Sequence, residues 1–98
     1  MATKAQIIQD ISTYVTNGGG SYSQWYIGIA AVPRDRLFTD HNVSEKNDLW
    51  IHDTCSTSDE ARAIEDYFVA KGMKGGPGGG DATTKSVYAY KITNSTKE

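Results

Sequence analysis

Hydrophobic positions in the first part of the chain follow the spacing of one helical face. They predict an amphipathic helix over about residues 3–16, with Thr3 and Gln6 placed to cap its first turn. The members of this stripe are Ile7, Ile8, Ile11, Tyr14 and Val15. Such a stripe needs a partner, and we expect it to cover one face of a small antiparallel sheet in preference to forming a dimer interface.

Residues 25–30 follow the alternating spacing of a β-strand rather than helical spacing. They are rich in aromatic and β-branched side chains, and the segment ends shortly before Pro33. With a period of two, the bulky apolar residues of this strand face the core. The opposite face carries the Tyr26 phenol beside Gly28, which has no side chain. This face therefore offers a shallow polar recess that a ligand can approach closely.

The clearest helical pattern covers residues 57–72. Thr57 and Glu60 fit a capping box, and Gly72 supplies the stop. Glu65 lies on or beside the apolar stripe of this helix rather than opposite it. Because carboxylates are rarely buried without a partner, we expect Glu65 to reach solvent at the edge, to pair with an arginine or to bind a metal ion.

These elements predict one small α+β domain over the full 98 residues. Residues 48–52 and 86–92 also have strand character, so we expect about three antiparallel strands packed with two main helices. The glycine-rich segment 72–81 joins the second helix to the last strand. A flexible loop is the favoured interpretation of this segment. A backbone nest in which Gly78 and Gly79 bind an anion is the alternative.

Charge and composition narrow the class of protein. The formal net charge is −2, from ten basic and twelve acidic residues, which argues against a strong binder of duplex nucleic acid. The single cysteine, Cys55, excludes an internal disulfide and fits a reducing compartment. The sequence contains no long apolar run and no basic leader, so we expect a cytoplasmic protein without a membrane segment.

Arginines that follow the first strand provide candidate phosphate ligands. Pro33 can start a helix, and Arg36 lies eight residues after Gly28. A strand that runs into a helix at this spacing can bring the guanidinium back over the strand's end, where it can hold a phosphate bidentately. Arg34 is a second candidate ligand for the substrate, and His41 offers a group that titrates near neutrality.

Three features in this order resemble the GIY-YIG nuclease superfamily. They are Tyr26-Ile27-Gly28, then Arg36 at the family's usual distance from the glycine, and then Glu60-Ala61-x-x-x-Glu65. The last is similar to the helix that carries the metal-binding glutamate in the excision-repair endonuclease subunit. His41 lies near the position of a histidine in some restriction-enzyme members. The resemblance covers about residues 24–71.

Two parts of the family pattern are replaced in this chain. Family members place a Gly-Ile-Tyr strand just before the Tyr-Ile-Gly strand, whereas residues 17–23 are rich in glycine and serine. The strand at residues 86–92 is a candidate substitute, as in a circular permutation, and would present Tyr88 or Tyr90 to the site. The family's asparagine beyond the glutamate helix is missing, and residues 75–81 are glycine-rich where it would fall.

The resemblance implies hydrolysis of a phosphodiester with one Mg²⁺ or Mn²⁺ ion bound by Glu65. Arg36 would offset charge in the transition state, and a phenol or an imidazole would position or deprotonate the attacking water. The candidate catalytic residues are Tyr26, Arg36, His41, Tyr88 and Tyr90, and the candidate substrate-binding residues are Gly28, Arg34, Gly78 and Gly79.

Other functions fit the same pattern. A catalytically degenerate GIY-YIG-like binding module or inhibitor would hold a nucleotide, a nucleic acid or a protein partner without cleaving it. A small-nucleotide receptor would combine the glycine loop and Arg36 with stacking on Trp50 or Tyr88. The pattern is compatible with a monomer or a weak homodimer. The change Glu65→Gln separates these functions, because it should abolish turnover by an enzyme and leave binding by a module intact.

Overall fold

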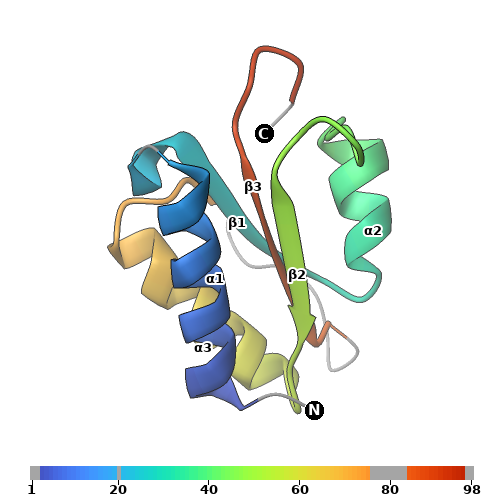
Figure 1. Ribbon diagram of the computed structural model, residues 1–98. Coiled ribbons are helices and arrows are strands. Elements are labelled where there is room, and N and C mark those ends of the chain that lie inside the picture. The colour runs from blue at the N-terminus through green and yellow to red at the C-terminus, as the bar shows by residue number, and fades with distance from the viewer. Residues whose placement is uncertain (1–2, 20, 76–83, 97–98) are drawn as a thin grey trace.

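A computed structural model describes residues 3–19, 21–75 and 84–96. Its centre is one three-stranded antiparallel sheet formed by β1 (Trp25–Ala30), β2 (Trp50–Thr54) and β3 (Ser86–Lys91). The order of the strands across the sheet is β1-β3-β2, so the last strand of the chain lies in the middle (Figure 1). The predicted α+β class with three antiparallel strands is confirmed.

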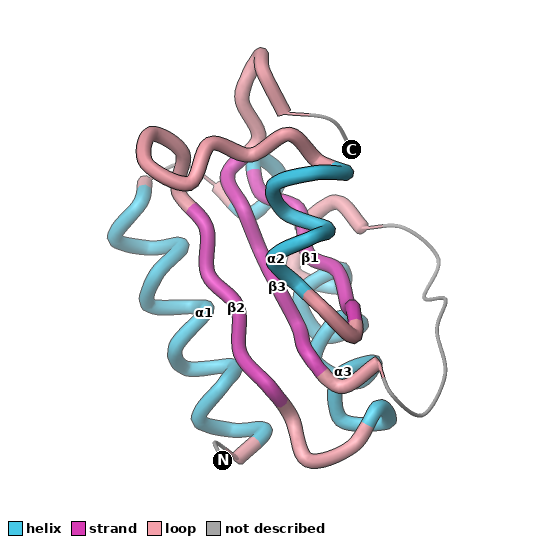
Figure 2. Tube along the Cα trace, turned by 90° about the vertical axis from the view of Figure 1, so that its right-hand side faces the viewer, coloured by secondary structure: helices cyan, strands magenta, loops and turns pink. Residues whose placement is uncertain are grey.

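Helices cover both faces of this sheet. The two long helices, α1 (Lys4–Gly18) and α3 (Ser58–Ala70), lie together on one face. The opposite face carries the short helix α2 (Pro33–Asp35), which continues into the π-helical turn η2 (Arg36–Asp40), as Figure 2 shows from that side. A 3₁₀ turn, η1 (Tyr22–Gln24), leads into β1. The predicted packing of the N-terminal helix on the sheet is therefore confirmed, and a third, shorter helical segment is added.

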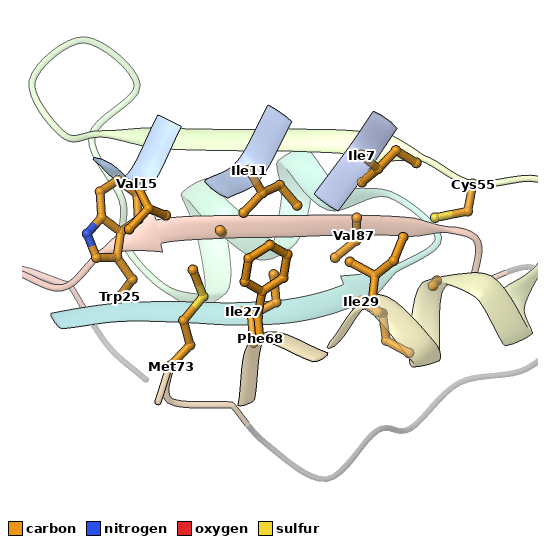
Figure 3. Close-up of a cluster of buried hydrophobic side chains, with 13 residues drawn as sticks. Ile7, Ile11, Val15, Trp25, Ile27, Ile29, Cys55, Phe68, Met73 and Val87 are labelled. Atoms are coloured by element: carbon orange, nitrogen blue, oxygen red, sulfur yellow. The ribbon is translucent and has the colours of Figure 1, made fainter. Parts of the chain in front are cut away.

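The main hydrophobic core fills the space between the sheet and the two long helices (Figure 3). Each element contributes the side chains that its hydrophobic period predicted, and Phe68 of α3 lies at the centre against Ile27 of β1. The buried members are Ile7, Ile11, Val15, Trp25, Ile27, Ile29, Cys55, Ala61, Ile64, Phe68, Met73, Val87 and Ala89. A second, smaller cluster of buried residues lies on the other face of the sheet; its members are Ala30, Leu37, Val43, Tyr88 and Tyr90.

Side-chain caps begin both long helices. Thr3 Oγ1 accepts a hydrogen bond from the backbone N–H of Gln6 at 3.1 Å, and Thr57 Oγ1 accepts one from the backbone N–H of Glu60 at 3.2 Å. Each bond satisfies an amide that has no partner within the helix. The predicted capping residues are thus confirmed at both positions.

We expect Thr57→Ala to lower the free energy of unfolding by about 1 kcal/mol, because the amide at the start of α3 loses its acceptor. Urea unfolding followed by circular dichroism measures this change. Ser58→Ala is the matched control, since within the described residues Ser58 makes no side-chain capping bond. Equal losses in both variants would contradict a capping role for Thr57.

Several boundaries differ from the predicted ones, and the second strand, Trp50–Thr54, is shifted by two residues at both ends. The second strand begins at Trp50 rather than at residue 48, because the Asp48 carboxylate accepts the backbone N–H of Ser44 at 2.8 Å and closes a turn there. The first helix continues to Gly18, beyond the predicted end, and stops where Gly19 adopts a φ of 83°. Glycine adopts this positive φ without a steric penalty, so the helix ends where Gly19 turns the chain away.

None of the helices in the described ranges is long and apolar enough to cross a lipid bilayer.

Candidate functional site

The register of the sheet brings three tyrosines together on the face opposite the main core. Tyr26 pairs with Tyr90 across β1 and β3, and Gly28 pairs with Tyr88 two residues further along. Since side chains at alternate positions share a face, all three phenol rings project from the same side. The rings of Tyr26 and Tyr90 are stacked with centroids 5.3 Å apart, and those of Tyr26 and Tyr88 with centroids 6.5 Å apart.

His41 lies over these rings and bonds to two of them. Its Nε2 atom lies 2.7 Å from the Tyr88 hydroxyl, and its Nδ1 atom lies 3.1 Å from the Tyr90 hydroxyl. Its ring centroid is also 4.7 Å from that of Tyr26. The imidazole is buried, with 6% of its surface exposed. The structure therefore holds one histidine between two phenols, which we call the Tyr-His-Tyr cluster (Tyr88, His41, Tyr90).

The π-helical turn η2 sets the position of His41. The backbone N–H of His41 donates to the carbonyl of Arg36 at 2.9 Å, which is the wider hydrogen-bonded ring of a π-turn. Leu37 of this turn is fully buried against the sheet and anchors it. Asn42 then reverses the chain with a φ of 57°, in the left-handed region that asparagine tolerates. π-Helical turns such as η2 occur frequently at functional sites.

Gly28 leaves the space that the Tyr88 ring occupies. A Cβ atom added to Gly28 would lie 2.5 Å from both Cζ and the hydroxyl oxygen of Tyr88. No side chain larger than hydrogen fits at this position while Tyr88 keeps its place. The expected recess open to a ligand beside Gly28 is therefore wrong, because the Tyr88 ring fills it, and the glycine admits a phenol from the neighbouring strand.

The two candidate arginines lie in different surroundings. The Arg36 guanidinium is about half-exposed and lies 3.3 Å from the Asp40 carboxylate. Arg34 forms an ion pair with Glu45, and its guanidinium lies 5.0 Å from the ring centroid of Phe38 and 5.8 Å from that of Trp50. Exposed pairs such as Arg36 with Asp40 contribute little to stability, so this guanidinium can be redirected to a ligand at low cost.

Glu65 is buried on α3, with 5% of its surface exposed. Within the part of the chain that the structure describes, its carboxylate takes part in no hydrogen bond or ion pair. Burial is the main cause that raises the pKa of Glu65 to about 7; the neighbouring charge of Asp66 acts in the same direction, and Arg62 acts in the opposite direction. Because no fully buried side-chain oxygen in the described residues lacks a hydrogen-bond partner, the Glu65 oxygens keep some contact with solvent, and their partial desolvation is still a cost to the fold.

Several of these charged groups affect the pKa of the Tyr88 phenol. Burial raises the pKa of the Tyr88 phenol above its ordinary value, and Tyr26 acts in the same direction. Arg36 lowers this pKa, whereas the carboxylates of Glu65 and Asp40 raise it. The charges of the candidate arginine and of the candidate metal ligand thus both act on the same phenol, although one lies on η2 and the other on α3.

The structure brings five of the residues that the sequence singled out together on one face of the sheet, whereas Glu65 lies on α3, which packs on the opposite face. Tyr26, Gly28, His41, Tyr88 and Tyr90 are in contact on one face of the sheet, and Arg36 and Glu65 act on Tyr88 electrostatically. Arg34 is instead engaged with Glu45, Phe38 and Trp50. Gly78 and Gly79 lie outside the described residues. In the described ranges, no group of three or more histidine, cysteine, aspartate and glutamate side chains is placed to hold a metal ion.

Sequence reasoning missed two parts of this arrangement. It treated His41 as a lone histidine, whereas the structure bonds the imidazole to two phenols. The spacing of Tyr88 and Tyr90 by two residues was the available signal, because it places both phenols on one face of a strand. It also gave no reason to expect the π-turn that positions the imidazole.

Fold and site together define a small α+β domain with a buried tyrosine and histidine cluster on one face of its sheet. Comparisons with protein-family models, with curated proteins and with solved structures found no match to this chain.

Proposed function

We propose that this chain is a metal-dependent phosphodiesterase of GIY-YIG type that acts on nucleic acid or on a smaller phosphodiester. One observation carries the proposal: Tyr26, His41 and Tyr88 gather beside Gly28 on the face of the sheet that also carries η2, the segment that begins with Arg36. A phosphate at this site would find a cation, phenols and an imidazole within one small region.

The position of β3 supports the same proposal. In the family pattern, a Gly-Ile-Tyr strand precedes the Tyr-Ile-Gly strand, whereas the described residues just before β1 form the end of α1 and the turn η1. Here β3 pairs along the whole length of β1 and brings Tyr88 and Tyr90 beside Tyr26. We therefore propose that the C-terminal strand takes the place of the missing strand, as in a circular permutation.

Glu65 fits the role of a ligand for Mg²⁺ or Mn²⁺. Its carboxylate is an oxygen donor of the type these ions prefer, and in the described residues it has no competing hydrogen bond or ion pair. Mg²⁺ commonly binds proteins through one or two carboxylates and keeps several waters, so a single glutamate suffices as protein ligand. When bound, the ion would polarise the phosphoryl oxygen and stabilise the leaving alkoxide.

The remaining residues have separate tasks in this proposal. Arg36 exchanges its exposed pair with Asp40 for a phosphate oxygen and offsets the charge that develops in the transition state. The Tyr88 hydroxyl, with Tyr26 beside it, orients the attacking water and accepts its proton. His41, bonded to Tyr88 at 2.7 Å, is the nearest group that can receive a proton from that phenol.

Cleavage of labelled single- and double-stranded DNA and RNA in Mg²⁺ or Mn²⁺ tests the proposal. We expect Arg36→Ala to lower kcat by about 100-fold, the effect of removing one donor to a developing anion. Its stability should change little, because the pair with Asp40 is exposed. Lys46→Ala is the control, because it removes an exposed positive charge that belongs to no candidate site, and it should retain most activity. The absence of metal-dependent cleavage from every substrate would overturn the proposal.

A catalytically degenerate binding module is the second candidate, and the buried phenol favours it. A tyrosine that deprotonates water needs a lowered pKa, whereas burial raises that of Tyr88. A module would use Arg36 and the phenols to hold a nucleotide, a nucleic acid or a protein partner without turnover. Its binding should survive Glu65→Gln and should need no metal ion, which distinguishes it from the enzyme.

A further inference from the structure

Neutral imidazole carries one N–H group, so His41 can donate to only one of its two phenols and must accept from the other. The two contacts differ in length. The Tyr88 hydroxyl lies 2.7 Å from Nε2, whereas the Tyr90 hydroxyl lies 3.1 Å from Nδ1. Hydroxyl donors form the shorter hydrogen bonds in proteins, and N–H donors form the longer ones. The distances therefore assign the proton of the Tyr88 hydroxyl to the bond with Nε2 and place the imidazole proton on Nδ1, where it is donated to Tyr90.

From this geometry we infer that Tyr90 is a positioning residue, which fixes His41 as the Nδ1–H tautomer so that Nε2 can take the proton of Tyr88. The catalytic role of Tyr90 rests on the proposed function. The hydrogen-bond pattern around His41 does not depend on it. Tyr90 is fully buried, so its role is exerted through His41 rather than on a substrate. Tyr88 is the phenol that lies over Gly28 and responds to the charge of Arg36.

The proton transfer balances within these residues. The O–H bond of Tyr88 breaks as its proton moves to Nε2 of His41, and the electron pair stays on the phenol oxygen. That oxygen then takes a proton from the attacking water, whose oxygen forms the new bond to phosphorus as the bond to the leaving oxygen breaks. The net result is one proton moved from water to His41, and the resulting imidazolium keeps its Nδ1–H bond to Tyr90.

Burial explains why such a relay is needed. A free Tyr88 phenolate is disfavoured, because burial raises the pKa of its phenol. A neighbouring base that receives the proton as it leaves avoids a long-lived buried charge. The same reasoning explains why both imidazole nitrogens are hydrogen-bonded: an imidazole held at only one nitrogen would be free to present the wrong tautomer to Tyr88.

Long-range ¹H–¹⁵N NMR of the histidine rings in the whole chain tests this inference directly. The spectrum is recorded at about pH 8, above the usual imidazole pKa of about 6.5. Only His41 and His52 contribute, and His52→Gln assigns the signals. We expect His41 to carry its proton on Nδ1. In Tyr90→Phe the proton should move to Nε2, whereas Tyr88→Phe and the exposed control Tyr67→Phe should leave it on Nδ1. A wild-type proton on Nε2, or an unchanged tautomer in Tyr90→Phe, would overturn the assignment.

Kinetics provide the second arm of the test. We expect Tyr90→Phe to lower kcat by about 10- to 100-fold with little change in KM, because a mispositioned base loses part of the general-base contribution. A parallel rise in KM with unchanged kcat would contradict the inference. If no variant and no wild-type protein cleaves, the proposed function fails on its own, while the tautomer spectrum still decides the role of Tyr90.

Discussion

Glu65→Gln should abolish metal-dependent cleavage and at the same time make the folded chain more stable above neutral pH. The loss of activity should be at least about 1000-fold, because removing a metal ligand sacrifices several kcal/mol of transition-state stabilisation. The gain in stability arises because glutamine removes a carboxylate that is buried without a hydrogen bond or ion pair in the described residues. A residue kept for packing alone would not combine these two effects.

The pH dependence of this gain has a definite sign. The pKa of Glu65 is raised from 4.5 to about 7 by burial. Below pH 4.5 the side chain is neutral in both folded and unfolded states, so the carboxylate carries no penalty there. Between these two values the unfolded state loses its proton first, and the stability of the wild type falls as pH rises. Above pH 7 the full penalty applies, which amounts to up to about 3 kcal/mol.

Urea unfolding of wild type and Glu65→Gln at pH 4 and at pH 8, without divalent metal, measures the effect. The two proteins should be similar at the lower pH, and the variant should be the more stable at the higher pH. Glu60→Gln is the matched control, because it makes the same chemical change on the same helix at a carboxylate that accepts the backbone N–H of Ser56. It should retain cleavage. A variant Glu65→Gln that is destabilised at both pH values would show that Glu65 is a structural residue.

Added Mg²⁺ extends this prediction to the wild type. A cation bound to the ionised carboxylate removes its desolvation penalty, so metal should raise wild-type stability at pH 8 and leave Glu65→Gln unchanged. Titration followed by NMR chemical shifts should centre the response on Glu65. An equal response in the variant would place the metal elsewhere.

Local rules were sufficient to predict most of the fold. The helical stripe that includes Ile7 and Ile11, and the alternation of Trp25 and Ile27, each follow from one period of hydrophobic positions. The caps at Thr3 and Thr57 follow from the chemistry of the first helical turn. These features depend on neighbours in the sequence, which is why a single sequence is enough to reveal them.

The candidate site depends on which residues pair across the sheet, and local sequence patterns do not determine these pairs. The sequence indicated that Tyr88 and Tyr90 share a face, but it did not determine that their strand lies beside β1 with Tyr90 opposite Tyr26. Nor did it indicate that a π-turn would carry His41 to both phenols, since π-turns follow no simple sequence period. Register and turn geometry, rather than residue type, were the missing information.

We expect Gly28→Ala to disturb the site because it displaces the Tyr88 ring. The added methyl group would lie 2.5 Å from Cζ of Tyr88, and the ring can move away only by breaking its hydrogen bond to His41. Overpacking of this kind costs about 1–3 kcal/mol in the free energy of unfolding. We also expect loss of activity, because the displaced Tyr88 no longer reaches Nε2 of His41. Urea unfolding and the cleavage assay measure the two effects.

A double-mutant cycle with Tyr88→Ala shows whether the clash is the cause. Without the phenol ring, the three atoms closest to the methyl group at Gly28 are removed, since all of them belong to Tyr88. Alanine is also intrinsically more favourable than glycine within a strand. Gly28→Ala should therefore be neutral or slightly stabilising in the Tyr88→Ala background, with a coupling energy between the two positions of about 1–3 kcal/mol. An equal cost in both backgrounds would mean that the strand needs glycine for some reason other than Tyr88. A coupling in the expected range would tie the glycine of the Tyr-Ile-Gly sequence to the phenol of β3, and so link the packing of the sheet to the position of the proposed proton relay.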